Sequence, residues 1–429
     1  MEKLLKLASQ AADQAEVYFN ESSSDGVEFN DGKLEKADSS LSSGIALRVI
    51  KNGKMGLAYT RNLLDPEALV KQALTSAENG VDVSFCLPLT KDLPTLDTYN
   101  TAIAELNKEQ LLSRGMDVID YIRSRVEGQV NLGIHYGWEK QGVLNSAGTY
   151  LQSRHSEFAI FTNMIFPGTG SGLIKYAVAR GMTDIPREEL DELIELFRLS
   201  ATEIVPPTKR MPVIFTPFTL FALLSRFSAA SSPASLYNKV SPLCDKLGQK
   251  IVSDKLSLYQ DPLAADMLST VAFDSEGTPT RKLDFIKNGV FAGYPTDLNY
   301  AAKLGVEPTG NGFRGGVGVL PSAQPVNVCV APGDKSLPEM ISGIDEGLIV
   351  HSLMGAHSGN VLNGDYSVGV SSGFLIRGGK ITGRVKDCML SGNAYETLSQ
   401  IAAIENKSMN FGSHKLPSIL CEDVSVAGK

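Results

Sequence analysis

The sequence predicts an α+β protein of two domains, and three observations support this fold class. The chain has 429 residues, more than one hydrophobic core usually serves. Predicted strands and helices are grouped, without a regular strand-helix alternation. Two successive prolines follow Val205 and cannot continue a helix or a central strand. We therefore expect an N-terminal domain of helices and antiparallel sheet over residues 1–205, and a C-terminal, mostly antiparallel β domain with a buried central helix over residues 206–429.

In the N-terminal half, helical patterns and hairpin signals follow one another. Residues 1–13 have the apolar spacing of an amphipathic helix, and Asn52-Gly53 between extended segments predicts a two-residue hairpin turn. Helical spacing recurs at 107–126 and, with an acidic first turn, at 186–197. Between these two helices, residues 130–166 have strand character. A meander of antiparallel strands accompanied by helices is the simplest arrangement.

The C-terminal half begins with a short apolar strand, residues 211–216, that leads directly into a helix at Pro217. Large apolar side chains occupy positions 218, 220, 221, 223, 224 and 227. They surround most of the helix, which is typical of a helix buried at the middle of a domain. Further along the chain, glycines and short strand patterns predominate.

A helix of this kind is where a metallopeptidase can place two histidines and a glutamate on one face. The turns from Leu223 to Ala230 instead contain Ser225, Arg226 and Ser228, with no His, Asp or Glu. Zinc ligands in proteins are Cys, His, Asp and Glu side chains. We therefore expect this helix to hold no metal and to activate no water.

Three short motifs in the C-terminal half match known site patterns only in part. Residues 310–315 have the glycine spacing of a dinucleotide fingerprint, but the required strand before them and helix after them are missing. Residues 369–373 have Gly-x-Ser-x-Gly spacing, but a strand continues beyond them. His351 and His357 could form a zinc site with Asp365, although their spacing is unusual for ligands. A hydrogen-bonded histidine at a loop mouth explains this pattern better.

Composition restricts the classes of function. The net charge is −8, from 48 acidic and 40 basic residues, and basic residues are not clustered, so we expect no nucleic-acid binding. No apolar stretch approaches the length of a membrane span or a secretion signal, so we expect no membrane association. The five cysteines are far apart, which favours free thiols in a reducing cytoplasm.

A long glycine- and asparagine-rich pattern resembles a known family. The run from Leu353 to Ile381, the following Leu390–Asn393 and the segment from Asn299 to Gly312 are similar to the signature of the TldD/PmbA family, often labelled modulators of DNA gyrase. Members of the TldD kind carry a His-Glu-x-x-x-His helix and a distant cysteine that together hold a metal for peptide hydrolysis. This chain lacks the motif after Pro217, and its Asn410–Lys415 segment has no cysteine. It therefore resembles the PmbA (TldE) kind.

The resemblance implies a non-catalytic subunit of a cytosolic metalloprotease that acts on unfolded peptides. The zinc would belong to a TldD-type partner, and this chain would hold no cofactor and no catalytic residue. A sheet edge or a glycine-rich groove could still take up an extended peptide through backbone hydrogen bonds. Arg314, His357, Asn360 and Asp365 are the candidates for lining that groove. Local hydrogen bonding within loops explains each of them equally well.

Two alternative functions stay open at this point. The chain could be a stand-alone peptide-binding or scaffold protein in the form of a homodimer, or a hydrolase with an unrecognised site such as His357 with Asp365. An acidic chain without a basic face provides no mechanism for contacting DNA. Any effect on gyrase would therefore be indirect.

Overall fold

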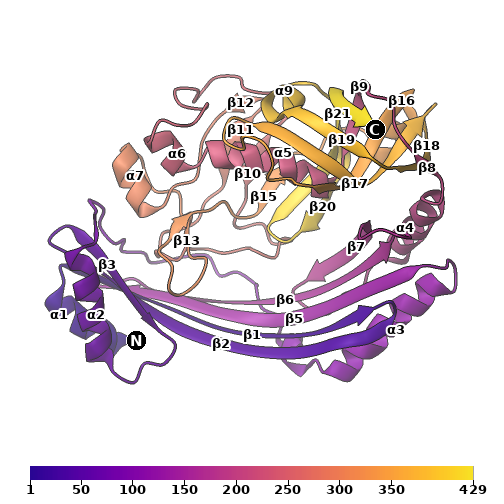
Figure 1. The fold of residues 1–429 in the computed structure, drawn as a ribbon. Coiled ribbons are helices and arrows are strands. Elements are labelled where there is room, and N and C mark those ends of the chain that lie inside the picture. Colours follow the sequence, from indigo (N-terminus) through magenta and orange to yellow (C-terminus); the bar gives the residue numbers. More distant parts are fainter. Residues whose placement is uncertain (429) are drawn as a thin grey trace.

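The computed structural model describes residues 1–428 and contains two large β-sheets, one above the other in Figure 1. The first sheet is antiparallel, has seven strands and follows the order β4-β3-β2-β1-β5-β6-β7. Its strands are β1 (Gln14–Asn30), β2 (Lys33–Lys51), β3 (Lys54–Thr60), β4 (Val81–Asp82), β5 (Gln129–Asn145), β6 (Tyr150–Ile165) and β7 (Gly172–Ala179). The accompanying helices are α1 (Glu2–Ala11), α2 (Pro66–Glu78), the 3-10 helix η1 (Thr101–Glu105), α3 (Lys108–Arg123) and α4 (Arg187–Leu199).

The second sheet has twelve strands and combines antiparallel with a few parallel pairs. Its strands are β8 (Glu203–Ile204), β9 (Lys209–Phe215), β10 (Leu258–Gln260), β11 (Leu283–Lys287), β12 (Val290–Phe291), β15 (Val328–Val330), β16 (Glu346–Met354), β17 (Asp365–Arg377), β18 (Lys380–Val385), β19 (Cys388–Asn393), β20 (Ile401–Phe411) and β21 (His414–Gly428). Its helices are α5 (Pro217–Ala230), α6 (Pro233–Tyr237), α7 (Leu298–Leu304), α8 (Leu337–Ser342) and α9 (Ala394–Ser399), and β13 (Gly312–Phe313) pairs only with β14 (Ser322–Ala323). The predicted α+β class is confirmed.

The hairpin predicted at Asn52-Gly53 is present between β2 and β3. Both residues have positive φ angles, 51° and 73°, as a tight turn of this kind requires. The predicted domain boundary at residue 206 stays a prediction. Immediately before it, β8 already pairs with β18 of the second sheet.

One face of the first sheet is apolar and is covered by helices. Val27, Ile134 and Phe158 on that face belong to the core that also contains the buried side chains of α3 and α4. Because side chains alternate along a strand, the neighbouring residues point to the opposite face, which is turned toward the second sheet (Figure 1). That inner face is largely polar, and it forms one wall of the candidate site described below.

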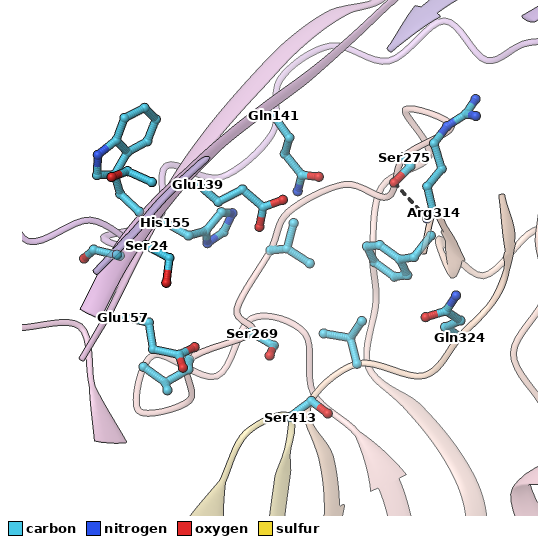
Figure 2. Close-up of a pocket in the computed structure, with 18 of the residues that line it drawn as sticks. Ser24, Glu139, Gln141, His155, Glu157, Ser269, Ser275, Arg314, Gln324 and Ser413 are labelled. Carbon is cyan, nitrogen blue, oxygen red and sulfur yellow. Dashed lines mark hydrogen bonds between the residues drawn. The ribbon is translucent and has the colours of Figure 1, made fainter. Parts of the chain in front are cut away.

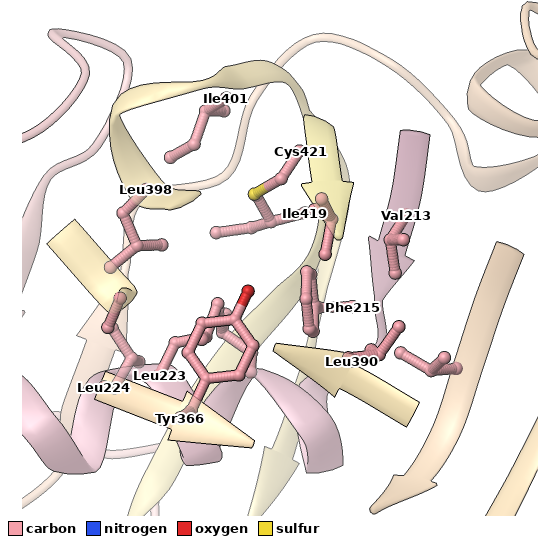
Figure 3. Close-up of a cluster of buried hydrophobic side chains, with 14 of the residues drawn as sticks. Val213, Phe215, Leu223, Leu224, Tyr366, Leu390, Leu398, Ile401, Ile419 and Cys421 are labelled. Atoms are coloured by element: carbon pink, nitrogen blue, oxygen red, sulfur yellow. The ribbon is translucent and has the colours of Figure 1, made fainter. Parts of the chain in front are cut away.

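The predicted strand and helix at residues 211–230 are present as β9 and α5. β9 lies between β21 and β16 at the centre of the second sheet. Leu223 and Leu224 of α5 pack with Phe215 of β9 and with Tyr366 and other side chains of the same core (Figure 3).

The predicted burial of α5 holds for most of the helix, but two phenylalanines of its first turns are exceptions. Phe218 is 38% exposed and Phe221 is 46% exposed, whereas Leu220 is fully buried. Phe218 and Phe221 lie on the side of α5 that faces the inner face of the first sheet, where Phe218 contacts Tyr176 of β7. This side of the helix does not face a closed core. No helix within residues 1–428 is long and apolar enough to cross a bilayer.

Candidate functional site

A cavity of about 620 Å³ lies between the inner face of the first sheet and loops of the second domain. Figure 2 shows side chains of β1, β5 and β6 on one side and side chains of the C-terminal loops on the other. A volume of this size falls in the range of small-ligand sites, roughly 300–1,000 Å³. The labelled lining residues are Ser24, Glu139, Gln141, His155, Glu157, Ser269, Ser275, Arg314, Gln324 and Ser413.

Strand register places the polar side chains of the sheet wall together. Glu139 of β5 lies opposite His155 of β6, and Glu157 follows two residues later on the same face. Burial lowers the pKa of His155 to about 4, so its imidazole is neutral near pH 7. The wall therefore offers two carboxylates and an uncharged histidine to the cavity.

The two carboxylates have no cationic side chain bound to them within the described chain. Glu139 accepts a hydrogen bond from the Asn20 amide. The side chain of Glu157 is exposed to the cavity, but partial desolvation by the surrounding residues raises the pKa of its carboxyl group. The guanidinium of Arg180, at the end of β7, instead donates to the backbone carbonyls of Ala265 and Met267, both at 2.6 Å.

A row of rings lies beside this cavity. The ring centroids of Tyr176 and Phe218 are 5.4 Å apart, those of Phe218 and Phe411 5.3 Å, those of Phe411 and His414 5.3 Å, and those of His414 and Phe221 5.4 Å. We call these five residues the aromatic row. It connects β7, α5 and the turn between β20 and β21, and Ser413 of that turn also lines the cavity. The aromatic row therefore adjoins the cavity at Ser413, whose hydroxyl lies 3.3 Å from His414 Nδ1.

Of the residues predicted to line a peptide groove, Arg314 borders the cavity, but its guanidinium does not face it. The group points away (Figure 2) and donates to Glu16 at 2.8 Å, with the side chain only 1% exposed. Glu16 also accepts from Arg48 at 2.6 Å, and Arg48 donates to Glu276 at 2.7 Å. This buried network, Glu16, Arg48, Glu276 and Arg314, joins β1 and β2 to two loops of the C-terminal domain.

The other three predicted residues, His357, Asn360 and Asp365, lie together on the loop between β16 and β17 and at its end, and all three are exposed. Local contacts involve two of them: Asn360 Oδ1 accepts from the backbone N–H of Asn363 at 3.1 Å, and Asp365 Oδ1 accepts from Asn393 at 3.0 Å. Their role in peptide binding stays a prediction.

Arg226 of α5 holds this loop. Its guanidinium donates to the backbone carbonyls of Asp365, Ala356 and Ser358 at 2.8 to 3.0 Å, and to Ala222 one turn earlier in the helix. The side chain is fully buried, and desolvation lowers the pKa of the guanidinium. A cation surrounded by carbonyl oxygens therefore fixes the β16–β17 loop on α5.

Comparison with known families decides the identity of the fold. The profile of the PmbA/TldA metallopeptidase C-terminal domain matches residues 208–428, and that of domain 1 of the same family matches residues 15–77. The chain belongs to the PmbA/TldD metallopeptidase family. The C-terminal match begins at Thr208 and covers β9, α5 and every later element.

Several proteins resemble the chain over nearly its whole length. It is 27% identical to Metalloprotease PmbA of Escherichia coli O157:H7, over 99% of this chain and 94% of that protein. The crystal structure of TldE from Thermococcus kodakarensis has a TM-score of 0.92 and 26% identity, covering 100% of both chains. A putative modulator of a DNA gyrase from Thermotoga maritima has a TM-score of 0.90 and 26% identity, covering 99% of both chains.

Membership of a metallopeptidase family raises the question of whether this chain's residues fit a metal. The helix and the distant segment that carry the ligands in TldD-type relatives do come together here, because α5 contacts the β20–β21 turn. They meet through Phe218, Phe221, Phe411 and His414. Within residues 1–428, no three His, Cys, Asp or Glu side chains form a group that could hold a metal ion. One imidazole and three phenyl rings do not fit zinc, which requires several N, S or O ligands.

Three features of this PmbA/TldD-type site were not predicted from the sequence. The alternation of β6 could have placed His155 and Glu157 on one face, because both follow the period of two. No local sequence pattern indicates the buried network, because Arg48 and Glu276 are 228 positions apart in the sequence. The aromatic row likewise joins residues from three separate elements.

Proposed function

We propose that this chain is the non-catalytic, peptide-holding subunit of a two-subunit cytosolic metallopeptidase. In this proposal, a TldD-type partner supplies the zinc and cleaves the peptide, while this chain contributes a cleft for an unfolded substrate. The five free cysteines are in keeping with a reducing compartment. Gyrase would be affected only indirectly, because the chain is acidic.

One observation carries the proposal. The two segments at which TldD-type relatives place their metal ligands are adjacent in this chain, but phenylalanine rings occupy the contact between them. The fold is therefore retained while the donor atoms are missing. A cleft with an aromatic row and free carboxylates beside it supports a binding role for the same region.

Reconstitution with a partner tests the proposal. The isolated chain should leave an unstructured peptide intact, and addition of a TldD-type relative with the His-Glu-x-x-x-His helix should produce cleavage that a chelator abolishes. A relative whose motif glutamate is replaced by glutamine is the matched control and should bind this chain without cleaving. Chelator-sensitive cleavage by the isolated chain would contradict the proposal.

A second candidate is a stand-alone peptide-binding or scaffold protein, and the cavity favours it because the cavity is built from this chain alone. A pull-down from the native host distinguishes the two. Recovery of a relative with the metal motif supports the subunit role, whereas a chain that binds peptide but recovers no such relative supports the stand-alone role.

A further inference from the structure

The first observation concerns two exposed rings on a helix that is largely buried. Phe218 and Phe221 leave 38% and 46% of their surface exposed at the start of α5, and each is within 5.4 Å of a ring of the β20–β21 turn. Exposed, contiguous apolar surface beside a cleft is typical of a binding site. Burying it against an apolar side chain would remove that surface from water.

The second observation concerns charge. Glu139 and Glu157 face the cavity beside the row, and neither forms an ion pair within the described chain. Three cations around the cavity have other partners: Arg180 donates to the carbonyls of Ala265 and Met267, Lys415 pairs with Asp266 at 2.6 Å, and Arg314 pairs with Glu16. Within the described residues, none of these cations forms an ion pair with Glu139 or Glu157, so both carboxylates are left for a basic ligand.

These two features adjoin at the turn between β20 and β21. Ser413 lines the cavity, and the neighbouring Phe411 and His414 belong to the aromatic row. An extended peptide advances about 3.3 Å per residue, so the spacing between its apolar and basic residues determines whether it reaches both the rings and the carboxylates. A single short segment could contact both.

We propose that the cleft selects unfolded peptides that carry an apolar side chain, preferably aromatic, a few residues from a lysine or arginine. The aromatic row receives the apolar side chain, and Glu157 with Glu139 receives the basic one. This inference rests on the proposed function, which it extends by naming the class of peptide. Hydrogen bonds to the peptide backbone would hold the remaining residues with little sequence preference.

A panel of fluorescent peptides tests the selection at pH 7.5. Each peptide has a glycine-serine backbone with one phenylalanine and one lysine, separated by one to five residues. We expect one spacing to bind best, replacement of its phenylalanine by alanine to weaken binding about tenfold, and replacement of its lysine by glutamine to weaken binding severalfold. The lysine contribution should disappear in high salt, whereas that of phenylalanine should persist.

Protein variants assign each contribution to its site. Phe221→Ala should remove the preference for phenylalanine while keeping that for lysine, and Glu157→Gln should do the reverse. Leu64→Ala and Glu188→Gln are the matched controls, because Leu64 is 84% exposed and Glu188 is an exposed carboxylate of α4. Both controls should bind the panel as the unmodified chain does.

The proposal is overturned if Phe221→Ala and Glu157→Gln bind the whole panel as the unmodified chain does, or if peptides without phenylalanine and lysine bind equally well. The same preparations separate this inference from the proposed function. A chain that contains stoichiometric zinc and cleaves the peptides contradicts the proposed function. A chain that contains no zinc but ignores both side chains contradicts only the selection proposed here.

Discussion

Replacement of Arg48 by methionine should lower the free energy of unfolding by about 3–5 kcal/mol, because it leaves the buried carboxylate of Glu276 without a cation and Glu16 with Arg314 alone. Arg48 is 2% exposed, and its partners Glu16 and Glu276 are 0% and 1% exposed. Burial opposes the charge on Arg48, but the two glutamates more than offset it and raise the pKa of the guanidinium. Chemical denaturation of the variant and the unmodified chain measures the loss.

An exposed ion pair provides the control for Arg48. Lys36 and Asp38 are 3.0 Å apart, and their side chains are 54% and 48% exposed, so Lys36→Met should change stability by less than about 1 kcal/mol. Equal effects of the two substitutions would show that the buried network does not stabilise the contact between β1, β2 and the C-terminal loops.

Replacement of Arg226 by methionine is the second change with a large expected effect. It removes the donor of three backbone carbonyls of the β16–β17 loop, and each buried acceptor left unsatisfied costs about 1–3 kcal/mol. We expect a loss of roughly 3 kcal/mol or more in stability, together with faster hydrogen exchange in the loop between β16 and β17. Hydrogen exchange followed by mass spectrometry measures both effects on the same sample.

Lysine at position 226 should rescue little of the loss, because an ammonium group cannot reproduce the planar fork that reaches Asp365, Ala356 and Ser358. Arg377→Met is the matched control, since Arg377 is an exposed arginine that pairs with Glu346 at 2.9 Å. If Arg226→Met left exchange in the β16–β17 loop unchanged, Arg226 would not be the residue that orders it.

Local sequence patterns were sufficient for the parts of the fold determined by near neighbours. The turn at Asn52-Gly53 and the passage from β9 into α5 at Pro217 both depend on a few consecutive residues, and both are present as predicted. The missing metal motif could also be read directly, because it concerns residue types at fixed spacing on one helix.

The features that depend on distant residues could not be predicted in the same way. The positions of apolar residues in α5 could not show that Phe218 contacts Tyr176 and Phe221 contacts His414, outside the hydrophobic core. Nothing near Arg314 in the sequence indicated that its guanidinium would form an ion pair with Glu16, which is 298 positions away. The candidate site depends on such pairings, so the residues that line its cavity could be recognised only from the structure.

The central claim is that this chain has no ligands for the metal on which its family's peptidase activity depends. Elemental analysis of the isolated chain, purified in the presence of zinc and then dialysed, tests this claim most directly. The account predicts zinc far below one ion per chain, with one ion per heterodimer when a TldD-type partner is present. One tightly held zinc ion per isolated chain would contradict it.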